Sequence, residues 1–100
     1  MKLQNKTLSD LGLTSQSGAN PAITGITNDS RKVCEGFLFA ALPGVNSHGI
    51  NFVSSAIQAG ASAILTDKIG YSKYLSNSNT SNFVFVVVEN PRETLARCAA

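Results

Sequence analysis

Few residues of this 100-residue chain have side chains that could do chemistry, and no catalytic constellation stands out among them. The sequence has no HExxH, no GxSxG and no glycine-rich loop ending in Lys-Ser or Lys-Thr. Zinc hydrolysis, acyl transfer and nucleotide hydrolysis therefore lack their usual motifs. His48 is the only histidine, and its glycine-flanked loop is more typical of a surface or capping residue than of a general base. Cys34 and Cys98 lack the paired spacing of a zinc site, so we interpret both as buried or unreactive thiols and predict no catalytic residue and no metal ligand.

Two polar loops are better candidates for binding, because each follows a predicted strand. Proteins of the α/β class bind ligands at the edge of the sheet where such strands end. In the first loop, residues 28–31, the Ser30 hydroxyl and neighbouring backbone groups can hydrogen-bond a planar heterocycle or a phosphate. Asp29 and Arg31 have a simpler role available, an ion pair with each other that stiffens the turn. We favour this structural role for the pair.

The second loop, residues 44–49, leads into a helix that is predicted to begin near Asn51. Free backbone N–H groups and the helix dipole favour an anion at such a place, and a diphosphate would suit it. Every strand-to-helix connection resembles this one to some degree. Taken alone, the loop therefore favours the plain interpretation as a connection.

Apolar runs predict four strands, with a helix between the second and the third. The strands are expected at residues 23–28, 37–42, 62–66 and 82–88, the last as a central strand covered on both faces. The helix is expected to bury the residues that recur at helical spacing before Gly60: Phe52, Val53, Ala56, Ile57 and Ala59. This order is typical of a βαβ unit. It predicts the α/β class, as a small Rossmann-like domain with a parallel or mixed sheet.

The remaining segments are predicted from their caps and their composition. Thr7 can cap a short, peripheral helix that ends at Gly12. Residues 67–81 end in a Ser and Asn tract and are expected to be exposed and mobile, with one helical turn. Asn90, Pro91 and Glu93 form a capping box, so a helix is expected to begin at Pro91. Its apolar spacing is still in phase at the last residue, and we therefore expect one module of a longer protein.

Composition excludes several classes of function. Hydrophobic residues make up 43% of the chain and charged residues 14%, which is typical of a globular protein rather than a disordered tail. The formal net charge of +2 is too small and too scattered for a nucleic-acid-binding stripe. The longest apolar run, residues 83–88, is far short of the roughly 20 residues that span a bilayer. We therefore expect a cytoplasmic protein that neither binds nucleic acid nor inserts into a membrane.

The chain contains an ordered series of motifs: ITGITNDSRKV (residues 23–33), EGFLFAALPG (35–44), GINF (49–52) and AIQAGA (56–61), followed by NPR (90–92) and LA (95–96). This series resembles the amino-terminal domain of the Mur ligases. The MurE type, the UDP-N-acetylmuramoyl-dipeptide ligases, is the most similar. A DSR triplet alone would mean little, but its order with the other motifs is specific, and the resemblance covers nearly the whole chain from about residue 8 onward.

This resemblance implies a role in peptidoglycan biosynthesis, and so in cell shape and division. MurE-type enzymes are ATP-dependent ligases that add the third amino acid of the stem peptide to UDP-N-acetylmuramoyl-L-alanyl-D-glutamate. Residues 1–90 would hold the UDP part of that substrate, and residues 91–100 would begin a helix leading to a central domain absent from this sequence. That domain would bind ATP and Mg²⁺, so these 100 residues alone are expected to be inactive and to hold no cofactor. The ligase is expected to be a monomer.

The resemblance also implies site residues. Asn28 and Ser30 would contact the substrate, and so would Val45, Asn46 and Ser47, whose backbone N–H groups would face the diphosphate. An aliphatic residue often stands where this chain has Asn28. The family usually has an acidic residue in place of His48.

Two rival interpretations stay open. The MurF type, which adds the terminal dipeptide, shares DSR and the strand after it, although the Gly-Ile pair ahead of the triplet (25–26) favours MurE. A stand-alone structural or adaptor domain without nucleotide affinity is the other. The amino acid that the parent enzyme adds would be decided in a carboxyl-terminal domain.

Overall fold

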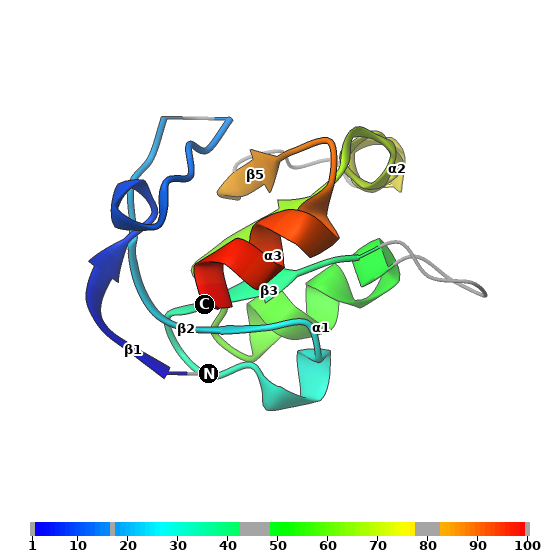
Figure 1. Ribbon diagram of the computed structural model, residues 1–100. Helices are drawn as coiled ribbons and strands as arrows, with labels where there is room; N and C mark the ends of the chain where they lie inside the picture. Colours follow the sequence, from blue (N-terminus) through cyan, green and yellow to red (C-terminus); the bar gives the residue numbers. More distant parts are fainter. Residues whose placement is uncertain (1, 17, 43–48, 78–82, 100) are drawn as a thin grey trace.

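The computed structural model describes residues 2–16, 18–42, 49–77 and 83–99, and these contain one mixed five-stranded sheet (Figure 1). The strands are β1 (Lys2–Thr7), β2 (Ala22–Thr27), β3 (Phe37–Ala40), β4 (Ala63–Thr66) and β5 (Phe85–Val87). They lie in the order β1-β2-β3-β4-β5, with β1 antiparallel to β2 and every later pair parallel. The predicted α/β class with a mixed sheet is confirmed.

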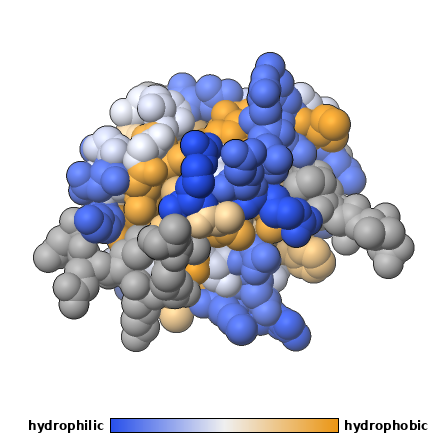
Figure 2. Space-filling model, in the orientation of Figure 1, coloured by the Kyte–Doolittle hydropathy of each residue, from blue (hydrophilic) through white to orange (hydrophobic). Residues whose placement is uncertain are grey.

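Helices cover both faces of this sheet. The α-helices are α1 (Val53–Gln58), α2 (Lys68–Asn77) and α3 (Pro91–Ala99), and the 3-10 helices are η1 (Ser9–Leu11), η2 (Ser30–Lys32) and η3 (Gly49–Phe52). Side chains of α1 and α2 pack on one face, whereas η1 and α3 pack on the other, the nearer face in Figure 1. Figure 2 shows mainly hydrophilic side chains over that nearer side. No helix of the described ranges is long and apolar enough to cross a membrane.

The core lies on both faces of the central strands, because neighbouring residues of a strand point to opposite sides. In β3, Phe37 and Phe39 join the cluster under α1 and α2, while Leu38 and Ala40 join the cluster under η1 and α3. All four residues of β3 and all four of β4 are buried. Burying each large apolar side chain contributes about 1.5–3 kcal/mol, so this continuous apolar run determines which strands lie inside.

The amino-terminal segment differs from its prediction. A strand, β1, precedes the predicted helical turn, and Leu8 in that turn is fully buried rather than peripheral. The sequence of β1, KLQNKT, has no apolar alternation that would predict a strand, and its backbone pairs antiparallel with β2 at the edge of the sheet. The predicted cap and stop are confirmed: Thr7 Oγ1 accepts a hydrogen bond from the Asp10 N–H (3.3 Å), and Gly12 has φ +78°.

Helix α2 corrects the prediction of a single exposed turn. It has ten residues and begins after Asp67, whose carboxylate accepts a hydrogen bond from the Gly70 N–H (2.7 Å). Tyr71 and Tyr74 pack against Phe85, with ring centroids 5.2 and 4.9 Å away. The two tyrosines are three residues apart, so helix formation brings both onto one face and gives the segment something to bury. Residues 78–82 of the predicted exposed tract lie outside the described residues.

Strand β5 is at the edge of the sheet, not at its centre as predicted. It nevertheless buries both faces, since Phe85 joins one core cluster and Val86 the other. The chain before β2 covers its outer side, where the Gln16 N–H donates to the Phe85 carbonyl (2.8 Å). This cover on both faces explains why an edge strand has the apolar sequence of a central one.

The predicted helix start at Pro91 and the N-cap at Asn90 are confirmed. Asn90 Oδ1 accepts a hydrogen bond from the Glu93 N–H, and the Thr94 hydroxyl donates to the Asn90 carbonyl, both at 3.1 Å. Pro91 is the first helical residue, as the missing N–H of proline favours. Leu95 and Cys98 pack on the sheet, so α3 belongs to this domain's own core.

Candidate functional site

The first predicted loop lies at the edge where the four parallel strands end. Strand β2 ends at Thr27, and η2 begins three residues later, at Ser30. A hollow of about 520 Å³ opens here. Its lining residues come from the loop, from η2 and from η3: Asn28, Asp29, Ser30, Arg31 and Phe52. Arg31 and Phe52, with 20 residues of sequence between them, therefore line one concavity at the edge where α/β folds bind ligands.

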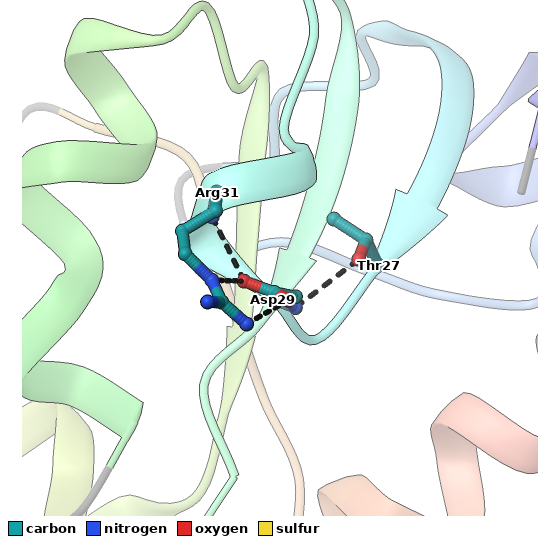
Figure 3. Close-up of polar contacts among 3 residues, drawn as sticks. All are labelled: Thr27, Asp29 and Arg31. Carbon is teal, nitrogen blue, oxygen red and sulfur yellow. Dashed lines mark hydrogen bonds and ion pairs between the residues drawn. The ribbon is translucent and has the colours of Figure 1, made fainter.

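Asp29 and Arg31 form a clamp that holds the loop, as predicted (Figure 3). Asp29 Oδ1 accepts hydrogen bonds from the Arg31 backbone N–H (2.9 Å) and Nε (3.1 Å), and Oδ2 accepts from the terminal guanidinium nitrogen (3.0 Å). The Asp29 N–H donates to Thr27 Oγ1 (3.1 Å), and the Lys32 N–H donates to the Asp29 carbonyl (2.9 Å). These bonds satisfy both carboxylate oxygens, so Asp29 stiffens the turn and is unsuited to accept a substrate proton.

We expect the clamp to open only in strong acid. The Arg31 side chain lowers the pKa of the Asp29 carboxyl from 3.8 to about 2, with help from the Arg31 backbone N–H. Because the pKa of the folded state lies below the ordinary value, the clamp's contribution is fully present above pH 4 and is lost as the pH falls through about 2. A ¹³C NMR titration of the Asp29 carboxyl should give that low midpoint. Arg31→Gln should return the midpoint toward 3.8, and an unchanged midpoint would contradict the clamp.

Two polar side chains of the hollow are free to bind a ligand. Within the described residues, neither the Asn28 amide nor the Ser30 hydroxyl has a hydrogen-bond partner. An amide offers donors and an acceptor, and a hydroxyl can do either. The clamp fixes the backbone that carries both groups, so they are presented by a stiff turn rather than by a loose loop.

The second predicted loop falls largely on residues that the structure leaves undescribed. The described residues do not include Val45, Asn46, Ser47 and His48. That this loop and Ser30 form one binding site therefore stays a prediction. The segments on either side are placed. Backbone pairing continues past β3, where the Ala41 N–H donates to the Leu65 carbonyl (2.7 Å). After the undescribed residues, η3 leads into α1, which lies against η2.

Phe52 lines the hollow, and its position differs from the one that the sequence pattern predicted. Helical spacing assigned it to the buried face of a helix, but it ends η3, lines the hollow and is 48% exposed. Val53 and Ala56 are fully buried, as predicted, whereas Ala59 is exposed. The α-helix begins one residue after Phe52, and the tighter 3-10 turn before it changes the direction of the ring. Periodicity alone gave no signal of this change.

The two cysteines are both free, and they differ in burial. Cys34 is exposed, because it lies in the turn between η2 and β3 rather than in either element. Cys98 is partly buried on α3, and burial raises the pKa of its thiol. No group of three His, Cys, Asp or Glu side chains that could hold a metal ion occurs in the described part of the chain. The sequence also has no glycine-rich loop that ends in Lys-Ser or Lys-Thr.

The fold and the hollow define a class, the α/β domains that bind ligands at the carboxyl ends of parallel strands. Residues 22–100 match the family described as "Mur ligase family, catalytic domain". The chain belongs to the Mur ligase family.

Curated relatives and solved structures agree with this assignment. The UDP-N-acetylmuramoyl-L-alanyl-D-glutamate--2,6-diaminopimelate ligase of Streptomyces coelicolor is 41% identical over 90 residues, which are 90% of this chain and 17% of that protein. The Caulobacter vibrioides ligase of the same name is 48% identical over 65 residues, 65% of this chain and 13% of that protein. This chain thus spans about a sixth of such relatives. MurF from Acinetobacter baumannii shares the fold at 21% identity and a TM-score of 0.71, with 97% of this chain and 21% of that chain covered.

Proposed function

We propose that this chain is the amino-terminal, substrate-binding domain of an ATP-dependent Mur ligase of the MurE type. One observation carries the proposal: the DSR loop, stiffened by its own ion pair, places the Asn28 amide and the Ser30 hydroxyl in a hollow at the strand ends, where neither has a hydrogen-bond partner among the described residues. The chain that presents this loop is 41% identical over 90 residues to a ligase named for UDP-N-acetylmuramoyl-L-alanyl-D-glutamate. The ligand proposed for the hollow is the uridine diphosphate part of that substrate.

The proposed role is to hold one end of a long substrate while chemistry occurs at the other. Binding energy gained at a nucleotide can position a distant carboxylate for reaction without touching it. Asn28 and Ser30 would hydrogen-bond the uridine. The backbone N–H groups of Val45, Asn46 and Ser47 would face the diphosphate, and such donors do not depend on side-chain identity. Neither His48 nor Asn28, which depart from the usual family residues, would then prevent binding.

The remaining parts of the reaction are proposed for other domains of the same chain. Residues 1–90 would form the UDP-substrate domain, and the helix that begins at Pro91 would lead to a central domain that binds ATP and Mg²⁺. The relatives' names include 2,6-diaminopimelate, which corresponds to the third amino acid of the stem peptide. We propose a cytoplasmic, monomeric enzyme of cell-wall synthesis.

The MurF type is the alternative, favoured by the shared fold of the MurF structures. Similarity of sequence favours MurE, because a diaminopimelate ligase of Parasynechococcus marenigrum is 49% identical over 57 residues. A stand-alone adaptor would have the same fold without nucleotide affinity. Titration with uridine diphosphate distinguishes the adaptor from either ligase.

Ser30→Ala is expected to weaken binding of uridine diphosphate by about fivefold to tenfold, since a hydrogen bond contributes about 1 kcal/mol and 1.4 kcal/mol is tenfold. Isothermal or NMR titration of the 100-residue chain at millimolar ligand would measure it. Ser72→Ala is the matched control, because Ser72 is exposed on α2 away from the hollow. Equal affinity of both variants and the unaltered chain would remove Ser30 from the site.

A further inference from the structure

Phe52 has a half-exposed ring that the core does not use. Within the part of the chain that the structure describes, it belongs to neither hydrophobic cluster and is not among the residues packed against them. The aromatic contacts of the described residues all centre on Phe85 and involve Tyr71, Tyr74 and Phe83. Val53, directly after it, is fully buried, so α1 docks on the sheet without the ring. At 48% exposure Phe52 leaves apolar surface in water, which a bound ligand would cover.

The surroundings of Phe52 limit what that ligand can be. Among its described lining residues, the hollow combines the Phe52 ring with the Asn28 amide, the Ser30 hydroxyl and the Asp29–Arg31 ion pair. The face of a phenyl ring carries negative potential, so it disfavours a phosphate and favours a planar, electron-poor ring. An apolar surface flanked by a few converging polar groups is the usual form of a small-molecule site. A heteroaromatic base matches both the aromatic ring and the polar groups of the hollow, because its face can stack on the ring while its edge forms hydrogen bonds.

We propose that Phe52 is the stacking surface for the uracil base, and that Asn28 and Ser30 hydrogen-bond the edge of the same base. The inference rests on the proposed function and adds a residue to its site. It also orients the ligand: the base lies at the DSR loop against Phe52, and the diphosphate extends away from the ring. Phe52 is thus a binding residue and takes no part in the chemistry.

The test compares three ligands with three variants of the 100-residue chain. Uridine diphosphate, ribose 5-phosphate and inorganic pyrophosphate are titrated by NMR. Stacking of a base on an aromatic ring contributes about 1–3 kcal/mol to binding. Phe52→Ala should therefore lower the affinity for uridine diphosphate by roughly tenfold or more. The same substitution should leave the affinity for ribose 5-phosphate and for pyrophosphate unchanged, because neither ligand has a base. Phe52→Tyr, which keeps the ring, should restore affinity, and Ile69→Ala should change nothing, because Ile69 is 75% exposed on α2 and does not line the hollow.

Direct contact is the second readout. Nuclear Overhauser effects between the uracil H5 and H6 protons and the Phe52 ring support the proposal. If uridine diphosphate binds the unaltered chain and Phe52→Ala equally well, the stacking proposal is wrong, whereas the proposed substrate-binding function is not contradicted. If the unaltered, folded chain binds no uridine diphosphate at millimolar concentration, the proposed function is wrong and the stacking proposal falls with it.

Discussion

Gly60→Ala should lower the free energy of unfolding by about 3 kcal/mol, for two physical reasons. Gly60 follows α1 with φ +111°, a backbone conformation that L side chains rarely adopt. A Cβ built there would lie 2.8 Å from the Cα of Glu35, which is backbone and cannot rotate away. The Gly60 carbonyl also accepts a hydrogen bond from the Gly36 N–H (2.8 Å), so the turn before β3 must approach this closely. Urea unfolding of the variant measures the loss.

Gly12→Ala separates strain from collision. Gly12 also has a positive φ, +78°, but nothing lies within 4 Å of a Cβ built on it. This variant should lose only about 1–2 kcal/mol, the cost of a left-handed conformation. Equal losses at the two positions would mean that the contact between Gly60 and Glu35 has no energetic weight.

Phe85→Ala should cost about 4 kcal/mol, because it empties the centre of one core cluster. Phe85 is 1% exposed, and three aromatic rings surround it: Tyr71, Tyr74 and Phe83. Its removal leaves α2 without the surface on which both tyrosines pack. Hydrogen exchange should therefore show faster opening of α2 than of α3, which packs on the other face.

Two controls accompany Phe85→Ala. Phe85→Leu keeps much of the buried volume and should cost about 1–2 kcal/mol. Phe52→Ala removes a half-exposed ring outside the core and should cost less than about 1 kcal/mol. A loss at Phe52 as large as that at Phe85 would show that Phe52 is a core residue, and would also count against its proposed binding role.

The sequence predicted those elements whose local pattern agrees with their final surroundings. Strands β3 and β4 are short apolar runs buried on both faces, and their pattern alone indicates this. Helix α3 carries its own cap, and the Asp29–Arg31 pair needs only neighbours two residues apart. In each case the stabilising interactions either join residues close in sequence or consist of apolar burial on both faces of a strand.

The errors occurred where distant contacts decide the outcome. Strand β1 is polar and is held by pairing with β2, which no local pattern reveals. Helix α2 is stabilised through Tyr71 and Tyr74, whose partner Phe85 comes more than ten residues later. Phe52 fits a helical apolar stripe, and only the 3-10 turn before α1 shows that its ring lines a hollow. The loop of residues 28–31, with Ser30, was predicted from its place after a strand, and the family resemblance added Asn28 as a contact; the role of both residues in binding stays a prediction.

The most direct test of the substrate-binding role is a ¹⁵N–¹H correlation spectrum of the 100-residue chain, recorded during titration with uridine diphosphate to millimolar concentration. We predict that the amide signals of residues 28–31 and 45–49 shift together with one dissociation constant, while those of β1 and the outer side of α2 stay in place. A spectrum that shows the intact fold and does not respond to the nucleotide would contradict the proposed role.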